Sequence, residues 1–225
     1  MRAFERAVPL NAVRPDRVRI IRTAIYLIGI VCTGMGIAGL LKARLGTDPL
    51  DAINAGVATK TGLSVGASSW IDAGLVLILA WILGRRPKIG TVLVAFLIGL
   101  VINLGLAVLP APHGYPLRAA MSAVSLAVLY LGVTGYVLSD LGAGCLEELM
   151  LAMVAKGAKI HRARWGIEAV LLAIAVALRG PINVVTVVFV ALTGPVLAWT
   201  IPHVATWLRI PIPHHDPGVP LGDIR

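Results

Sequence analysis

Two carboxylates that stand within apolar stretches are the chain's sharpest candidates for chemistry. These are Asp72 and Glu168, which lie 96 positions apart. A carboxylate on an apolar membrane helix is costly, so it usually faces a cavity or a partner and often belongs to an ion or substrate path. A purely structural interpretation also fits, in which Asp72 accepts a hydrogen bond from Ser68 and Glu168 pairs with Arg164, each one helical turn earlier.

A second group of candidates lies at the beginnings of two short predicted helices, 49–60 and 145–156. Its members are three carboxylates and one amide: Asp48, Asp51, Glu147 and Asn54. In transporters with inverted repeats, broken helices direct their N-terminal ends at the substrate. Carboxylates at such ends disfavour an anion and favour a cationic, zwitterionic or proton-coupled ligand. The alternative is that Asp48 and Asp51 only cap and complement their own helix, and that Asn54 hydrogen-bonds between helices.

The elements that must position these residues form a repeat. The stretch 45–72 begins LGTDPLD, and the stretch 141–168, 96 positions later, begins LGAGCLE. Under this offset Asp51 matches Glu147 and Asp72 matches Glu168. Self-similarity of this kind indicates a duplicated structural unit.

Composition excludes a soluble domain. Of 225 residues, 58% are hydrophobic and 14% charged, and the mean hydropathy is +0.88. Apolar runs near twenty residues indicate helices that cross a bilayer. The net charge of +9 comes from basic residues at the ends of these runs, where they meet lipid headgroups. We therefore expect membrane lipids, and not nucleic acid, around the chain.

We predict an all-α polytopic membrane protein of two tandem repeats, each with three transmembrane helices and one short half-helix. The expected long helices are 20–41, 65–83, 89–109, 119–138, 165–178 and 181–204. The expected organisation is a basic cytoplasmic leader 1–19, repeat one 20–109, a linker 110–118, repeat two 119–205 and a polar, proline-rich tail 206–225. Glycines in the first long helix, 20–41, and in the helix 119–138 are expected to let helices approach closely.

The number of crossings depends on the two short helices. Three crossings per repeat make the repeats inverted, whereas four make them parallel, with eight crossings in all. With a cytoplasmic N-terminus, basic residues divide fifteen inside and five outside in the first arrangement, and fourteen and six in the second. The shortness and polarity of the half-helices favour six crossings and inverted repeats in a bacterial inner membrane.

The remaining polar residues suggest little chemistry. Cys32 and Cys145 are expected to pack as separate small side chains, and Asn103 to hydrogen-bond between helices. The tail residues His214, His215 and Asp216 could bind a metal ion, but an exposed pair of histidines in a tail more often has no such role. No catalytic motif is present in the sequence, so we expect neither an enzyme nor a metal or other cofactor.

Several motifs resemble those of the YczE/YyaS/YitT-type bacterial integral membrane proteins. They are Leu45–Asp51, Lys60–Gly66, Gly90-Thr91 and Ile98-Gly99. The resemblance extends over about 20–204 and implies a bacterial inner-membrane protein. The second repeat departs from the first of these motifs, since it reads GCLE over residues 144–147, so the two halves of a site would be unequal.

The repeat and its paired acids favour a small-solute transporter or permease-like protein, with a site between the half-helices and proton coupling through Asp72 and Glu168. The alternative is a non-transporting membrane partner that scaffolds or matures other proteins. Association with such a partner, or of the chain with itself, remains open at this level.

Overall fold

The computed structural model describes residues 15–158 and 160–210, and within them every regular element is an α-helix. The helices are α1 (Pro15–Ala43), α2 (Pro49–Thr61), α3 (Val65–Ile82), α4 (Ile89–Val108), α5 (Tyr115–Ser139), α6 (Cys145–Ala155), α7 (Ile160–Ala177) and α8 (Val184–Leu208). Most of the predicted leader and tail, including His214, His215 and Asp216, lies outside the described residues.

Five helices of the described chain, α1, α3, α4, α5 and α8, are long and apolar enough to cross a membrane. Large apolar side chains on them face outward: Leu75 is 63% exposed, Leu104 60% and Val187 68%. Apolar surface of this extent suits contact with lipid, not water. The chain is therefore an all-helical, multi-pass integral membrane protein.

Three helices begin earlier than predicted, and the first of them is α1, which begins at Pro15 instead of 20. α7, the expected fifth long span, begins at Ile160 instead of 165, and its first half carries Arg162, Arg164 and Glu168. These charges lower its hydropathy, and it is not among the five. α5 begins at Tyr115 instead of 119, because Pro116 fits the first turn of a helix. The predicted linker 110–118 is correspondingly shorter.

The short helices have the predicted ends. The Asp48 carboxylate accepts the backbone N–H of Asp51 at 3.0 Å, with Pro49 in the first turn, and Gly62 ends α2 in the left-handed conformation at φ 77°. α2 has 13 residues and α6 has 11. At ~1.5 Å per residue they extend roughly 20 and 17 Å, well short of a ~30 Å hydrocarbon core.

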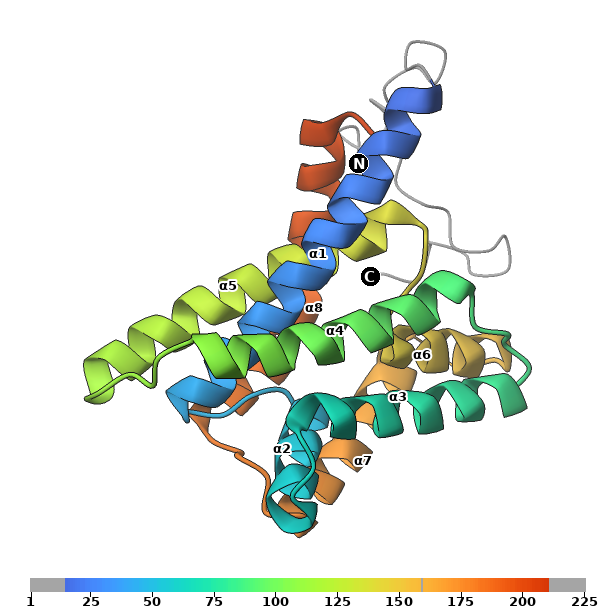
Figure 1. Cartoon of the computed structure of the whole chain (residues 1–225). Helices are drawn as coiled ribbons and strands as arrows, with labels where there is room; N and C mark the ends of the chain where they lie inside the picture. Colours follow the sequence, from blue (N-terminus) through green and yellow to red (C-terminus); the bar gives the residue numbers. More distant parts are fainter. Residues whose placement is uncertain (1–14, 159, 211–225) are drawn as a thin grey trace.

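Glycines bring α1 and α5 into close contact, as the sequence predicted. A Cβ atom on Gly29 would stand 2.7 Å from the carbonyl oxygen of Gly132 and 2.7 Å from the backbone nitrogen of Tyr136. Since backbone atoms occupy that space, only glycine permits this crossing. The pair forms the spine of the molecule, which Figure 1 shows with α1 crossing α5.

α4 packs against α1 and α8 packs against α5, and the other four helices form a second group that contacts α4. α3 contacts α2, α4 and α6, and α7 contacts α2 and α6. Asn103 fastens α4 to the beginning of α3: its Oδ1 accepts the backbone N–H of Gly66 at 2.9 Å, and its Nδ2 donates to the Ser64 hydroxyl at 3.1 Å. The predicted hydrogen bond between helices is thus confirmed.

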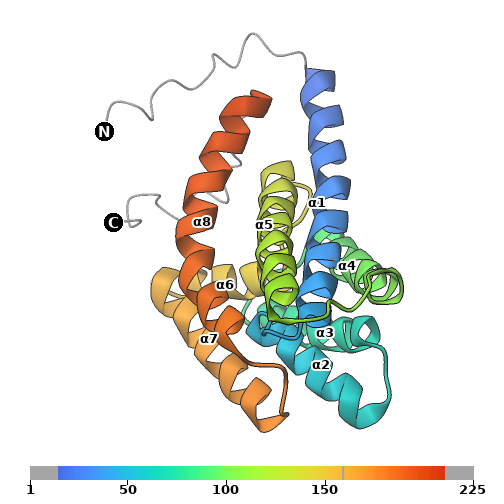
Figure 2. The same ribbon diagram turned by 90° about the vertical axis from the view of Figure 1, so that its left-hand side faces the viewer.

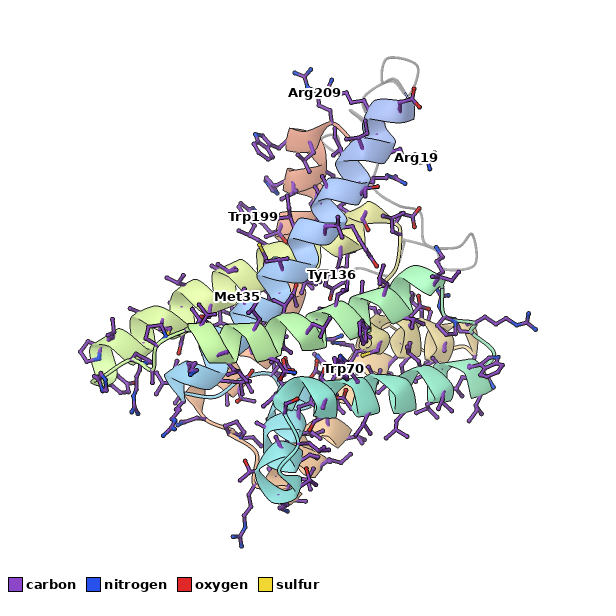
Figure 3. The ribbon with its side chains drawn as sticks, in the orientation of Figure 1. Arg19, Met35, Trp70, Tyr136, Trp199 and Arg209 are labelled. Carbon is purple, nitrogen blue, oxygen red and sulfur yellow. The ribbon has the colours of Figure 1, made fainter. Side chains whose placement is uncertain are left out.

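The beginning of α1 and the end of α8 extend from the same end of the molecule, opposite α2 and the lower end of α7 (Figures 1 and 2). Arg19 and Arg209 mark these two ends in Figure 3. Nearby, Asp140 at the end of α5 pairs with Arg22 of α1 at 3.6 Å and with Lys88 at 3.7 Å. Charged groups therefore hold three segments together at the N-terminal end of α1.

Candidate functional site

A cavity of about 140 Å³ lies among the helices and is partly open to the outside, and all eight helices contribute to its wall. At roughly 10–15 Å³ per water, it has room for about ten water molecules or a small organic molecule. All six residues proposed from the sequence line it: Asp48, Asp51, Asn54, Asp72, Glu147 and Glu168. Residues up to 120 positions apart in the chain thus meet at one space.

The α2 side of the cavity is built by the helix start. Asp48 is the N-cap residue and Asp51 follows one turn later, so both carboxylates come to the same end of α2. Asp51 is 5% exposed and Asn54 is 1% exposed. The Asn54 side chain is within hydrogen-bonding reach of the carboxylates of both Asp51 and Asp72. Local capping accounts for Asp48, but it leaves Asp51 and Asn54 available to the cavity.

Asp72 reaches the cavity from the middle of α3, beside Ser69 and Ala73. Its Oδ2 atom is buried and has no hydrogen-bond partner among the described residues. The predicted hydrogen bond from Ser68 is wrong, because the Ser68 hydroxyl is itself buried without a partner. Asn54 of α2 takes that role from across the interface, so the carboxylate is turned toward α2 and the cavity.

The opposite side is built by α6 and α7 around Arg164. Its guanidinium lies 2.7 Å from Glu168 Oε1 and 3.5 Å from Glu147 Oε1. The pairing of Glu168 with the arginine four positions earlier was predicted, whereas the bridge to Glu147 was not. Glu168 is 7% exposed, and its second oxygen, Oε2, has no hydrogen-bond partner among the described residues.

Sequence reasoning missed an aromatic and hydroxylic part of the wall. Tyr130 of α5 stacks on Phe189 of α8 with ring centroids 5.8 Å apart, and its hydroxyl donates to the Phe189 carbonyl at 3.3 Å. Tyr136 and Thr33 also line the cavity, and Thr33 has a buried hydroxyl with no partner among the described residues. Polar atoms in glycine-bearing spans were the available signal, but their direction was not visible in the sequence.

The charges of the described cavity wall are strongly unequal, with five carboxyl groups against one guanidinium. The guanidinium is already engaged with two of the carboxylates. No set of three or more His, Cys, Asp or Glu residues in the described ranges has metal-binding geometry. Both cysteines are free thiols, as expected, and Cys145 lies at the cavity while Cys32 does not. This arrangement suits binding of a solute or protons.

Comparison with known proteins identifies a family and several relatives, and none of them has an assigned function. The model of a family of unknown function, DUF6198, matches residues 20–202. The uncharacterised membrane protein YczE of Bacillus subtilis is 30% identical over 186 residues, covering 81% of this chain and 86% of YczE. The uncharacterised protein YyaS of the same organism is 29% identical over 168 residues, covering 72% and 83% respectively.

An uncharacterised protein of Haemophilus influenzae is 24% identical over 167 residues, covering 74% of this chain and 77% of its own length. No solved structure matches the chain. None of these three relatives is described with a substrate or a reaction.

Proposed function

The chain belongs to the DUF6198 family and is similar to YczE and YyaS, and from this premise we propose that it transports a small solute. The observation that carries the proposal is the meeting of Asp72 and Glu168 with the starts of both short helices at one cavity. Intramembrane acids and broken-helix ends together are typical of transporter sites.

The contacts between helices support a two-fold repeat around this site, and three crossings in each half would make the halves inverted. Contact of α2 with α7 corresponds to contact of α6 with α3, and contact of α1 with α4 to contact of α5 with α8. Individual residues follow the same relation. Gly46 approaches Thr186, and its counterpart Gly142 approaches Thr91. In each case a glycine of one half contacts a threonine of the other half, as expected when a pseudo-two-fold axis relates the halves.

Six crossings with a cytoplasmic N-terminus in the inner membrane are part of the proposal. Helices α2 and α6 are too short to cross, and protein covers the first half of α2 and most of α6, as non-spanning backbone at membrane depth requires. The six crossings would be α1, α3, α4, α5, α7 and α8. The common end of α1 and α8 in Figure 2 supports an even number of crossings.

Coupling to protons would use Asp72 and Glu168. The titratable and charged groups near Asp72 are Asp48 and Asp51 of α2 and Cys145 of α6. Those near Glu168 are Asp48, Glu147, Arg164 and Tyr130. The α4 part of the cavity wall is apolar. Since neither acid is fully satisfied by hydrogen bonds, each has an oxygen available to a proton or a solute.

The test begins with a comparison of metabolites between cells that lack the protein and cells that overproduce it. Compounds that differ are then offered to proteoliposomes with and without an imposed proton gradient. We expect flux of at least one compound, and loss of its gradient dependence in Asp72→Asn and Glu168→Gln. Asp16→Asn, which removes an exposed acid far from the cavity, is the matched control.

If liposomes holding the folded protein move none of these compounds, transport is refuted. Stable co-purification with one membrane protein, together with unaltered behaviour of both acid variants, would instead favour a scaffolding or maturation role. Retained flux with an unchanged gradient dependence in both variants would refute proton coupling alone.

A further inference from the structure

The acids on one side of the cavity form no ion pair, whereas the two acids on the other side share an arginine. On α2 and α3, Asp48, Asp51 and Asp72 form no ion pair with any described residue. On α6 and α7, Glu147 and Glu168 share Arg164. The first side therefore lacks positive charge, although it faces a buried space in which isolated carboxylates are costly.

The engagement of Arg164 bears on the class of ligand. A zwitterion or an anion needs a cation or free backbone donors for its carboxylate, and the one guanidinium in the described wall already binds two glutamates. An anion entering this space would also face five carboxyl groups. Electrostatics thus disfavours ligands with a negative group and favours a positive one.

Two further observations indicate that a ligand belongs here. Thr33 is 4% exposed, yet its hydroxyl has no hydrogen-bond partner among the described residues and it lines the cavity. Buried polar atoms are normally satisfied, so an orphaned hydroxyl on a cavity wall suits a missing polar partner. Glu168, 7% exposed, likewise presents an unpartnered Oε2 atom.

The rest of the wall is apolar and aromatic. Tyr130 and Phe189 form a fixed stacked pair, and Ile98, Val133 and Leu197 extend the apolar surface between them and the other helices. A bare metal ion would leave this surface unused, whereas an organic molecule would bury its body against it. Aromatic faces also attract a cationic head.

We propose that the cavity binds a small organic monocation, with its ammonium group on Asp72 and Asp51 and its apolar body against the Tyr130–Phe189 wall. This inference rests on the proposed function and names its substrate class. Asn54 holds the two carboxylates in place as a positioning residue.

A series of ligands that share one body and differ in charge tests the inference. The probes are 2-phenylethylammonium, phenylalanine as the zwitterion, 3-phenylpropanoate as the anion and 2-phenylethanol as the neutral form. Binding to the purified full-length chain is measured by thermal shift and calorimetry. We expect binding of the cation, and at least tenfold weaker binding of the other three.

Variants locate the site. Asp72→Asn is expected to weaken binding of 2-phenylethylammonium at least tenfold, whereas Asp16→Asn leaves it unchanged, since Asp16 is exposed and remote. If Asp72→Asn is not recovered folded, Asp51→Asn carries the same expectation. Asn54→Asp, which keeps the shape but replaces the amide donor by a third acid, is expected to weaken binding of the cation, because the Asp51 and Asp72 carboxylates lose the group that positions them.

Three results would overturn the inference: no binding of the cation at millimolar concentration, equal or tighter binding of the anion or zwitterion, or unchanged cation binding in Asp72→Asn and Asp51→Asn. Flux of 2-phenylethylammonium into proteoliposomes is measured in parallel. Binding without flux of this or any other compound refutes transport and leaves the ligand class standing. Flux of an anion instead refutes the ligand class and leaves transport standing.

Discussion

Replacing Arg164 by methionine should destabilise the protein through the two glutamates that it compensates. Methionine keeps much of the side-chain length but removes both ion pairs, at 2.7 Å to Glu168 and 3.5 Å to Glu147. Glu168 has a side chain 9% exposed, so its charge would stay in an apolar interior without a partner. Breaking a fully buried pair costs about 3–5 kcal/mol.

The structure sets a smaller value here. The side chain of Arg164 is 22% exposed and that of Glu147 is 24% exposed, so water screens part of the interaction. We therefore expect a loss of about 2–3 kcal/mol in the free energy of unfolding. For a chain of this length, each kcal/mol lowers the melting temperature by about 2–4 °C, which gives a fall of about 4–12 °C.

The assay is thermal unfolding of purified protein in detergent, followed by tryptophan fluorescence. Arg162→Met is the matched control, because Arg162 is exposed and lies on the same helix two positions earlier. Adding Glu168→Gln to Arg164→Met should recover much of the loss, since it removes the buried charge that the first change orphans.

Equal melting temperatures for Arg164→Met and Arg162→Met would refute the reasoning. So would a double variant that is less stable than Arg164→Met, because the cost would then lie in packing and not in an uncompensated carboxylate. Either result would show that Arg164 does not stabilise the protein by compensating the charges of Glu147 and Glu168.

Three further perturbations test other parts of the structure. Gly29→Ala should cost about 1–3 kcal/mol because its Cβ meets backbone of α5, whereas Gly74→Ala, with open space around it, should be neutral or stabilising; thermal unfolding distinguishes them. Asn103→Ala should cost about 1–2 kcal/mol in the same assay, since it leaves the Gly66 N–H without its partner. In a chain without native cysteines, Leu63→Cys should react with an impermeant thiol reagent from outside the cell and Arg86→Cys only from inside; the reverse, with Leu63→Cys reacting only from inside and Arg86→Cys from outside, is what eight crossings require and would contradict six.

Much of the secondary structure followed from the sequence because its causes are local. Asp48, Pro49 and Gly62 bound α2 through capping, a fixed φ and a left-handed residue, all of which act within a few positions. The bounds of α5 and α7 were wrong where a favourable proline or a charged first turn extended the helix beyond the apolar run. Hydropathy alone does not register such turns.

The acids of the candidate site could also be found in the sequence, because a carboxylate among apolar residues is conspicuous and the repeat shows it twice. Their surroundings could not be found in this way. The Ser68 hydrogen bond was wrong: the Ser68 hydroxyl has no partner among the described residues, and Asn54, on a different helix, hydrogen-bonds to Asp72. Tyr130 and Phe189, which form the aromatic pair, are 59 positions apart and belong to different helices.

By itself, the sequence determined that the chain is a helical membrane protein with two short helices and paired acids. Only the tertiary structure decided that those acids meet at one cavity, that Arg164 compensates one side of it and that an aromatic pair lines another part of its wall. The reason is the rotation of each helix about its axis. Contacts such as that of Gly29 with Gly132, 103 positions apart, set this rotation, and no local pattern encodes it.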